Sequence, residues 1–251
     1  MEQLQYQLKS IRLSGMAQTL PMRLQEAQAN ELPHLDFLTA LVTDELEKRK
    51  ERLLARRLKA ARFPMLKTLD EFDFAFNPGI NKRQIRELAT CRFVHAAENV
   101  LLLGPPGVGK THLAISLGMA AIQKGYTVLY RSIFDLAEDL AEAQALGMRK
   151  QLIKDLTKPN LLIIDEFGMR NLPASAAEDL LEIFHRRYQL GANIIATNRP
   201  IEDWGKILGD NATTSAILDR FMDGIHLIKI TGRSYRVKSL NKKLDKTKAN
   251  D

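Results

Sequence analysis

The chain has 251 residues, a formal net charge of +7 and a hydrophobic content of 45%, which is an ordinary composition for a globular protein with one α/β domain and a smaller appendage. A single cysteine, Cys91, excludes a disulfide framework and a cysteine-rich metal site. No stretch approaches the roughly 20 apolar residues of a membrane span, so we expect a cytoplasmic protein with no membrane partner.

The positive charge is concentrated in two segments. Residues 48–62 hold eight basic residues and one acidic residue, and residues 238–251 hold five lysines and two aspartates. Elsewhere acidic residues are in slight excess. Charge gathered in this way indicates contact with a polyanion. We expect residues 238–251 to form a basic flexible tail that adds non-specific affinity.

Residues 1–65 are predicted to form a small all-α domain. Apolar residues recur at helical spacing from Leu4 to Ile11, a second helical stretch surrounds residues 22–29, and a longer helix is expected from about Leu35 to Arg62. Phe63-Pro64 ends this helix, because proline lacks the backbone donor and disfavours helix in the residue before it.

Basic side chains line one side of the long helix. Four of them follow one another at offsets of three, four and three residues, which places them in a row: Arg49, Arg52, Arg56 and Lys59. Such a row can follow a phosphate backbone; the alternative is a solvated basic face, but like charges at these offsets cost stability. The DNA-binding candidates of this domain are Lys48, Arg49, Arg52, Arg56, Arg57 and Lys59.

Residues 66–237 are predicted to form a second, α/β domain. It begins with a linker, 69–79, whose three phenylalanines at alternate positions either dock on the domain or form a short strand. A helix over 82–95 follows. Strands and helices then alternate, which predicts a parallel sheet covered by helices. We expect strands at 100–103, 127–131, 161–164, 193–197 and 225–230, and helices at about 110–123, 133–146, 174–189 and 212–222.

A phosphate-binding loop follows the first of these strands. The pattern G-x-x-x-x-G-K-[ST] lies between a strand and a helix, which is the context that supports the motif. Backbone N–H groups of such a loop surround an anion, Lys110 adds a charge near the β and γ phosphates, and Thr111 can ligate Mg²⁺. The loop consists of Gly104, Pro105, Pro106, Gly107, Val108, Gly109, Lys110 and Thr111.

Polar residues also follow the third and fourth strands, at the sheet edge where ligands of such folds collect. Asp165 can hold a hydrated Mg²⁺, and Glu166 can orient or deprotonate a water molecule for attack on the γ-phosphate. The alternative is that two acids simply cap a strand. Asn198 stands where an amide could touch the γ-phosphate or the attacking water, although Asn-Arg-Pro alone is only a turn signal.

A second basic stretch lies between the second and third strands. It contains Arg149 and Lys150, which are further candidates for DNA contact. A solvated helix is an equal alternative for this stretch.

In this order, GPPGVGKT, LLIIDE and ATN resemble the Walker A, Walker B and sensor 1 motifs of the AAA+ ATPases, over about Leu69 to Arg236. The resemblance implies hydrolysis of ATP to ADP and phosphate, with ATP and Mg²⁺ as cofactors. Arg220 then stands where the family carries an arginine finger that reaches a neighbouring subunit's nucleotide. Arg236 resembles the sensor 2 arginine, which touches nucleotide in its own subunit. An ordinary surface arginine is the alternative for each.

Only 21 residues follow Ile230, too few for the C-terminal helical lid of typical AAA+ proteins. A five-stranded core without a lid, behind a small helical domain, resembles the helicase-loader branch typified by DnaC. The chain is more closely similar to the IstB-type helper ATPases of bacterial insertion sequences. The segments that carry this similarity are 12–17, 87–92, 125–130, 179–183 and 216–220.

The resemblance implies an ATP-dependent, DNA-binding helper of transposition. Its subunits would oligomerise with ATP on duplex DNA without reading sequence, deform it, recruit and stimulate the cognate transposase, and separate after hydrolysis. One alternative is a DnaC-like loader of a replicative helicase. Another is a structural DNA-bending protein with vestigial nucleotide binding, which would not need Glu166 or Arg220. A GTPase is disfavoured because Asn241-Lys242-Lys243-Leu244-Asp245 has the wrong spacing for N-K-x-D.

Overall fold

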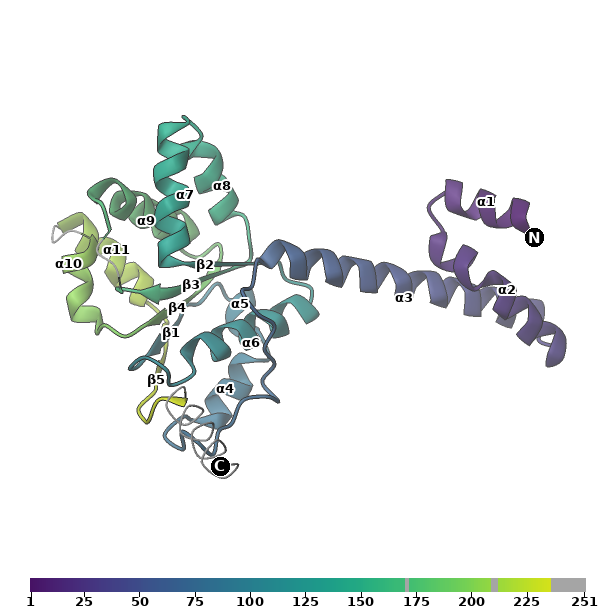
Figure 1. Ribbon diagram of the computed structural model, residues 1–251, viewed down its shortest axis with the longest axis horizontal. Coiled ribbons are helices and arrows are strands. Elements are labelled where there is room, and N and C mark those ends of the chain that lie inside the picture. The colour runs from purple at the N-terminus through teal and green to yellow at the C-terminus, as the bar shows by residue number, and fades with distance from the viewer. Residues whose placement is uncertain (170–171, 209–211, 236–251) are drawn as a thin grey trace, which may run out of the picture. The chain divides into compact units, whose positions relative to one another are not determined.

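The structure is a computed structural model that describes residues 1–169, 172–208 and 212–235 (Figure 1). The chain divides into two compact units between Arg57 and Leu58. This division falls inside helix α3 (His34–Ala61), several residues before the boundary near residue 65 that the composition suggested. Among the described residues, no helix is both long and apolar enough to cross a membrane.

The first unit is helical, as expected. It contains α1 (Glu2–Ser10), α2 (Ser14–Ala29) and most of α3. Helix α2 begins well before the expected start near residue 22 and continues through Pro21. The buried apolar side chains of this unit are few: Ala17, Leu20 and Leu41. Polar contacts between helices therefore contribute much to fixing how the helices of this unit pack.

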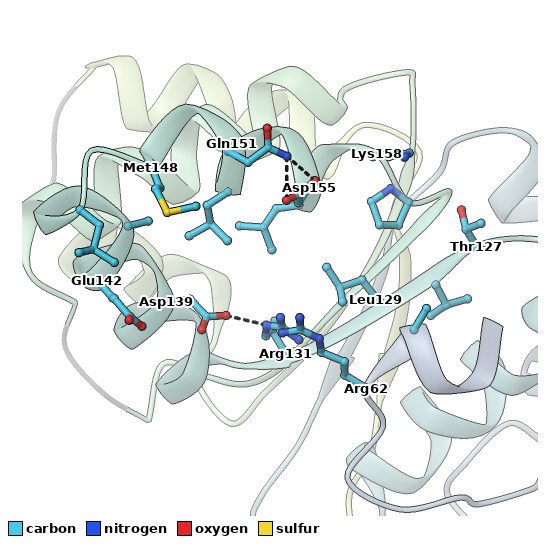
Figure 2. A pocket seen from close by; sticks show the side chains of 17 residues that line it. Arg62, Thr127, Leu129, Arg131, Asp139, Glu142, Met148, Gln151, Asp155 and Lys158 are labelled. Atoms are coloured by element: carbon cyan, nitrogen blue, oxygen red, sulfur yellow. Dashed lines mark hydrogen bonds and ion pairs between the residues drawn. The ribbon is translucent and has the colours of Figure 1, made fainter. Parts of the chain in front are cut away.

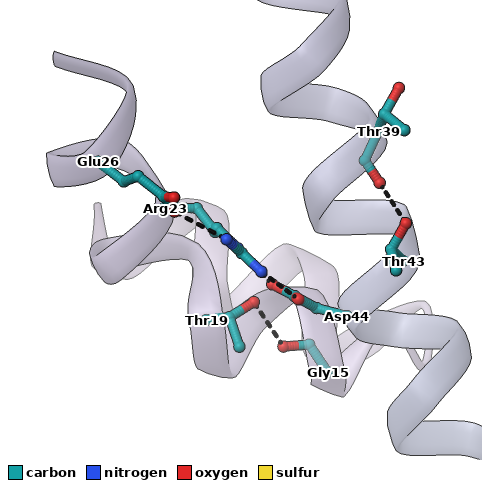
Figure 3. A network of polar contacts seen from close by, with 7 residues as sticks. All are labelled: Gly15, Thr19, Arg23, Glu26, Thr39, Thr43 and Asp44. Carbon is teal, nitrogen blue, oxygen red and sulfur yellow. Dashed lines mark hydrogen bonds and ion pairs between the residues drawn. The ribbon is translucent and has the colours of Figure 1, made fainter. Parts of the chain in front are cut away.

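One of these contacts joins α2 to α3 through a charged pair. The guanidinium of Arg23 donates to both carboxylate oxygens of Asp44, over 2.8 and 2.9 Å, and to Glu26 over 2.7 Å (Figure 3). Two parallel hydrogen bonds fix the mutual orientation of the groups as well as their distance. Hydrogen bonding from Arg23 holds the pKa of Asp44 below its ordinary value.

A second contact holds the first turn of α2 on α3. The carboxylate of Glu45, which is 4% exposed, accepts hydrogen bonds from the backbone N–H groups of Gly15 (2.6 Å) and Met16 (3.1 Å) and from Arg49 Nε (2.7 Å). A carboxylate at a helix N-terminus satisfies orphan donors and complements the helix dipole. A Cβ atom at residue 15 would lie 2.8 Å from Glu45 Cα, so this approach requires glycine.

The second unit is built on a five-stranded parallel sheet, which confirms the predicted fold class. The strand order is β2-β3-β4-β1-β5. The observed ends lie within a few residues of those predicted, and the largest difference is at β3, which continues through the acidic pair. The strands are β1 (Val100–Leu103), β2 (Val128–Ser132), β3 (Leu161–Phe167), β4 (Ala192–Thr197) and β5 (His226–Lys229).

Helices cover both faces of this sheet (Figure 1). Alternate strand residues, such as Leu102 and Ile163, face a cluster that includes α6 (Lys110–Gln123). Their neighbours, such as Leu101 and Ile164, face a second cluster. That cluster includes residues of α7 (Ile133–Ala145), α8 (Arg149–Thr157), α9 (Ala174–Arg187), α10 (Trp204–Leu208) and α11 (Ala212–Met222). Strands buried on both faces read as continuous apolar runs, which is why they were recognisable in the sequence.

The segment before β1 differs from the prediction. The single helix expected over 82–95 is divided into α4 (Lys82–Leu88) and α5 (Arg92–His95). Cys91 separates them with a φ of 62°, a left-handed conformation that interrupts a helix. Phe72 and Phe74 pack against the core, with ring centroids 4.8 Å apart, and no strand forms there.

A buried arginine fixes the amino-terminal edge of β3 and β4. Arg187, 1% exposed, donates to Asn193 Oδ1 and to several backbone carbonyl groups. Burial lowers the pKa of Arg187 to about 10. The carbonyl acceptors belong to Leu156, Thr157, Pro159, Asn160 and Ala192.

Candidate functional site

The phosphate-binding loop lies between β1 and α6, as the motif predicts. Gly109 is the N-cap residue of α6, and Lys110 and Thr111 begin its first turn. The first backbone N–H groups of a helix have no partner inside the helix, and the dipole makes this end positive. The loop therefore presents a site for an anion at the carboxyl end of β1.

Two glycines of the loop occupy positions that other residues cannot take. Gly107 and Gly109 have φ values of 81° and 103°. A Cβ atom on Gly109 would lie 2.7 Å from the ring of Phe72, and one on Gly107 would lie 2.1 Å from Ser234 Oγ. Both the left-handed backbone and the close packing therefore select glycine.

The side chain of Lys110 curls over its own loop. Its Nζ donates to the carbonyl oxygens of Gly104 (2.7 Å) and Pro105 (2.8 Å). These two contacts hold the ammonium group within the loop. A bound phosphate would be met by a positive charge that is already in position.

A pocket of about 370 Å³ adjoins the loop. Phe72, Phe76 and Asn77 from the segment before β1 line it, together with Tyr235. The rings of Phe76 and Tyr235 meet edge to face with centroids 5.1 Å apart, and the Tyr235 N–H donates to Gly107 O over 2.9 Å. This is the size and the mixed apolar and polar lining of a small-molecule site.

Thr197, at the end of β4, joins the loop to the acidic strand. Its carbonyl accepts a hydrogen bond from Gly104 N (3.1 Å), and its hydroxyl donates to Phe167 O (2.7 Å). The side chain is fully buried. We call this arrangement the Thr197 junction. Thr197 is the threonine of the ATN motif, but the motif predicted no role for its side chain.

The carboxylate of Asp165 is buried at the end of β3. It is 2% exposed, and its oxygens accept from the Tyr130 hydroxyl (3.0 Å) and from the Glu166 N–H (2.8 Å). Burial raises the pKa of Tyr130, and the charge of Asp165 adds to the effect, so the hydroxyl remains a donor. These two donors fix the direction of the carboxylate.

Glu166 has an unusual backbone conformation. Its φ is 59°, which is uncommon for a residue other than glycine. The pairing of β3 with β4 shifts by one residue between Ile164 and Phe167, so the strand contains a bulge here. Such strain is often found at functional sites. The bulge re-aims the side chain at this position, which an ideal strand would not do.

The remaining nucleotide-site candidates lie in three separate parts of the chain. Asn198 is exposed directly after β4. Arg220 is exposed in the last turn of α11, with its Nη1 3.3 Å from His185 Nδ1. Arg236 lies outside the described residues.

The oxygen ligands at this edge suit Mg²⁺. Thr111 offers a hydroxyl and Asp165 a carboxylate, and Mg²⁺ prefers hard oxygen ligands while keeping several waters. No cluster of three or more histidine, cysteine or acidic side chains that could hold a metal occurs among the described residues. The residues present therefore fit an ion held by one or two protein groups together with phosphates, not an all-protein cage.

The DNA-binding candidates on α3 fall into two groups. Lys48 pairs with Glu51, and Arg49 pairs with Glu45 and donates to Arg12 O. Arg52 donates to Ser14 Oγ over 2.5 Å. These contacts tie the first group to their own unit. Over the described ranges, the second group forms no hydrogen bond or ion pair: Arg56, Arg57 and Lys59.

The two basic candidates on α8 also differ. The guanidinium of Arg149 is held by two carboxylates of α9, at 2.5 Å from Asp179 and in a shorter contact with Glu182. Lys150 is exposed. Arg149 therefore joins two helices, while Lys150 remains available to a partner.

A separate hollow of about 550 Å³ lies beside β2 (Figure 2). Leu129, Met148 and Leu152 contribute apolar surface, and Arg131 crosses it to Asp139 with a contact of 2.8 Å. No residue of the phosphate-binding loop lines this hollow. Residues 107–111 of the loop line the smaller pocket instead.

Comparisons with known proteins place the chain among insertion-sequence proteins. A family described as IstB-like ATP binding protein matches residues 6–243. An ATP-binding protein of insertion sequence IS21 from Pseudomonas aeruginosa is 37% identical over 242 residues, covering 96% of this chain and 91% of the relative. That of IS5376 from Geobacillus stearothermophilus is 35% identical over 241 residues, covering 96% and 95%. AMPPCP-bound DnaA from Aquifex aeolicus shares the fold, with a TM-score of 0.56 and 22% identity, over 74% of this chain and 56% of that one.

Proposed function

Because the chain belongs to the family of IstB-like ATP binding proteins, we propose that it is an ATPase that binds duplex DNA and assists transposition. The Thr197 junction is the observation that carries this proposal. It connects the phosphate-binding loop to the acidic end of β3 through two hydrogen bonds. The connection holds the loop beside the strand end that carries Asp165 and Glu166, so a bound phosphate and these carboxylates share one edge of the sheet.

Each polar group near the junction has a role in this proposal. The loop from Gly104 to Thr111 binds the phosphates of ATP, and Lys110 exchanges its carbonyl acceptors for phosphate oxygens. Thr111 and Asp165 hold Mg²⁺, which neutralises phosphate charge when bound. Glu166 orients a water molecule and accepts its proton. Asn198 contacts the γ-phosphate or this water.

DNA is bound by the basic side chains that the fold leaves available. Arg56, Arg57 and Lys59 on α3, and Lys150 on α8, are the candidates with neither a hydrogen bond nor an ion pair among the described residues. Contacts from such side chains to phosphates position a protein on DNA without reading its sequence. The relatives are named for insertion sequences, which supports a transposase as the protein partner.

ATP couples to assembly through Arg220. If this arginine completes the nucleotide site of a second copy, ATP binding and association of subunits favour each other by linkage. Hydrolysis then removes the γ-phosphate that the arginine contacts, and the assembly loosens. An arginine supplied in trans can raise the rate of phosphoryl transfer by a factor of about 10³–10⁵.

Sedimentation of the purified chain tests the proposal. Samples contain ATP, ADP or no nucleotide, each with and without duplex DNA. We expect a large species with ATP and DNA together. Lys110→Ala should prevent its formation because the phosphates lose their charge partner, and Glu166→Gln should accumulate it because binding continues while hydrolysis stops.

A monomer in all six conditions would contradict the proposal and favour a loader that needs a replicative helicase. The interaction with DNA has a separate test. Changing Arg56, Arg57 and Lys59 together should weaken binding and lower the salt slope by about one for each phosphate that is no longer neutralised. Changing Arg49 and Arg52, which are tied within the helical unit, serves as the matched control and should alter the slope less.

A further inference from the structure

Two adjacent pairs of residues join α9 to α11. Inside the unit, the rings of Phe184 and Phe221 lie 4.9 Å apart and both side chains are buried. At the surface, the neighbouring residues His185 and Arg220 meet, with Nη1 of the arginine 3.3 Å from Nδ1 of the histidine. The buried pair fixes the two backbones, and the outer pair fixes the direction of the guanidinium.

The chemistry of the outer pair defines the state of the imidazole. A guanidinium group has donors and no acceptor, so His185 Nδ1 must accept the hydrogen bond. For this contact to form, the ring must carry its proton on Nε2 and leave Nδ1 free to accept. A protonated ring would offer no acceptor and would place two positive charges together.

Carboxylates near this pair are placed differently. Asp223 accepts from the Tyr188 hydroxyl over 3.3 Å, and Glu182, one turn before His185, pairs with Arg149 and Arg186. Asp219 and Asp223 line the same small hollow as Arg220. Within the described part of the chain, Arg220 nevertheless forms no ion pair with any of them.

A neutral acceptor has a functional consequence that a carboxylate would not have. A carboxylate would form an ion pair with the arginine and cancel its charge, as Asp179 and Glu182 do for Arg149. An imidazole holds the group more weakly and leaves its positive charge intact. The guanidinium is then oriented, and it remains able to leave for a phosphate.

We propose that His185 is a positioning residue for Arg220, holding its guanidinium at the subunit surface in the orientation from which it reaches nucleotide bound by a second copy of this chain. The inference rests on the proposed function, because it requires Arg220 to act in trans. His185 itself touches no nucleotide. A displaced reacting group can cost a hundredfold in rate, so the effect of removing the His185 side chain is measurable.

Mixed subunits test the proposal with the full chain, ATP and duplex DNA. Lys110→Ala subunits cannot bind ATP but carry Arg220, whereas Arg220→Ala subunits bind ATP and lack the arginine. Each alone should be inactive, and their mixture should hydrolyse ATP at shared sites. The Lys110→Ala donors are then prepared with a second change at residue 185.

We expect donors with His185→Ala to lower kcat of the mixture by about ten-fold or more, with KM for ATP unchanged, because the nucleotide is bound by the other subunit. Donors with His185→Asn should restore the rate, since the amide oxygen replaces the Nδ1 acceptor. Donors with His95→Ala, an exposed histidine elsewhere on this unit, serve as the control and should leave the rate unchanged.

The outcomes distinguish the action of Arg220 in trans from the positioning role of His185. Equal rates with His185→Ala and unaltered donors would overturn the positioning role while leaving the action of Arg220 in trans intact. Failure of the first mixture to hydrolyse ATP would overturn the action in trans and the positioning role together. Equal loss with His185→Ala and His185→Asn would also contradict the proposal, because an acceptor alone should suffice.

Discussion

The hydroxyl group of Tyr130 donates a hydrogen bond to the carboxylate of Asp165 across neighbouring strands, over 3.0 Å. Both side chains are buried, at 7% and 2% exposure. In the register of β2 with β3, Tyr130 stands opposite Ile163, two residues before Asp165, so the two side chains share one face of the sheet. The proposed metal ligand is therefore oriented by a residue from a different strand.

Removing this hydroxyl should impair the use of Mg²⁺. Tyr130→Phe leaves one oxygen of a buried carboxylate without its donor, at a cost of about 1–3 kcal/mol. Loss of a group that orients a metal ligand typically reduces affinity or activity by about ten-fold or more. ATPase rates measured against Mg²⁺ concentration should show a higher requirement. Tyr126→Phe is the matched control, and an unchanged Mg²⁺ profile for Tyr130→Phe would contradict the role of Asp165.

The Thr197 junction makes a second prediction. Thr197→Val conserves shape but removes the donor to Phe167 O and the acceptor for the Arg199 N–H. We expect a loss of about 1–2 kcal/mol in the free energy of unfolding and a fall in kcat with little change in ATP affinity. Thr90→Val, which removes an exposed hydroxyl, should change neither quantity. Equal kcat values for the Thr197 variant and the unaltered chain would remove the junction from the mechanism.

The left-handed conformation of Glu166 predicts that a glycine variant is at least as stable as an alanine variant, which is the reverse of the order at an ordinary helical position. In that conformation the folded state of an alanine variant is strained by about 1–2 kcal/mol, whereas a glycine is not strained. The glycine variant has a more flexible unfolded chain, which reduces this advantage by about 0.4–1 kcal/mol. Glu166→Gly should therefore be at least as stable as Glu166→Ala in thermal unfolding, and both should lack ATPase activity.

The same pair of changes at an ordinary helical position provides the control for this order. Glu178 is exposed within α9. There, glycine should be less stable than alanine by about 1 kcal/mol. The strain at Glu166 would be refuted if glycine were disfavoured equally at both positions.

The stability of the helical unit should depend on acid through Glu45. Burial alone would raise the pKa of Glu45, but hydrogen bonds from Arg49, Met16 and Gly15 outweigh it, so the pKa lies below its ordinary value of 4.5. The unfolded chain then binds the proton first as the pH falls. The stabilisation is complete well above pH 4.5 and is lost as the pH falls through the folded pKa.

Hydrogen exchange of the α2 amides against pH, corrected for the intrinsic rate, measures this dependence. Glu45→Gln should flatten it. Gly15→Ala should lower protection at every pH by about 1–3 kcal/mol, because the added methyl group collides with α3. A pH dependence that persists in the Glu45→Gln variant would assign it to another carboxylate, such as Asp44.

The neighbouring residues Arg149 and Lys150 should respond in opposite ways. Arg149→Ala leaves the buried Asp179 carboxylate without its partner, which costs about 1–3 kcal/mol of stability, but should not change the salt dependence of DNA binding. Lys150→Ala should leave thermal stability unchanged and reduce the salt slope by about one. Each variant is the control for the other. If Arg149→Ala reduced the salt slope of DNA binding and left stability unchanged, Arg149 would contact DNA after all.

Local patterns in the sequence determined the sheet and the phosphate-binding loop. The apolar runs 100–103 and 161–164 are strands buried on both faces, and the loop motif between strand and helix fixes the place of Lys110 and Thr111. These features depend on residues adjacent in the chain, so spacing and side-chain type suffice to predict them. The acidic pair was recognisable for the same reason, because it follows an apolar strand directly.

Only the tertiary structure decided which polar groups meet. Arg149 and Lys150 look equivalent in the sequence, but the first is paired with α9 and the second is exposed. The contacts of Thr197 and His185 likewise join segments that lie 30 or more residues apart. Such partners are brought together by sheet register and helix packing, which no local pattern encodes.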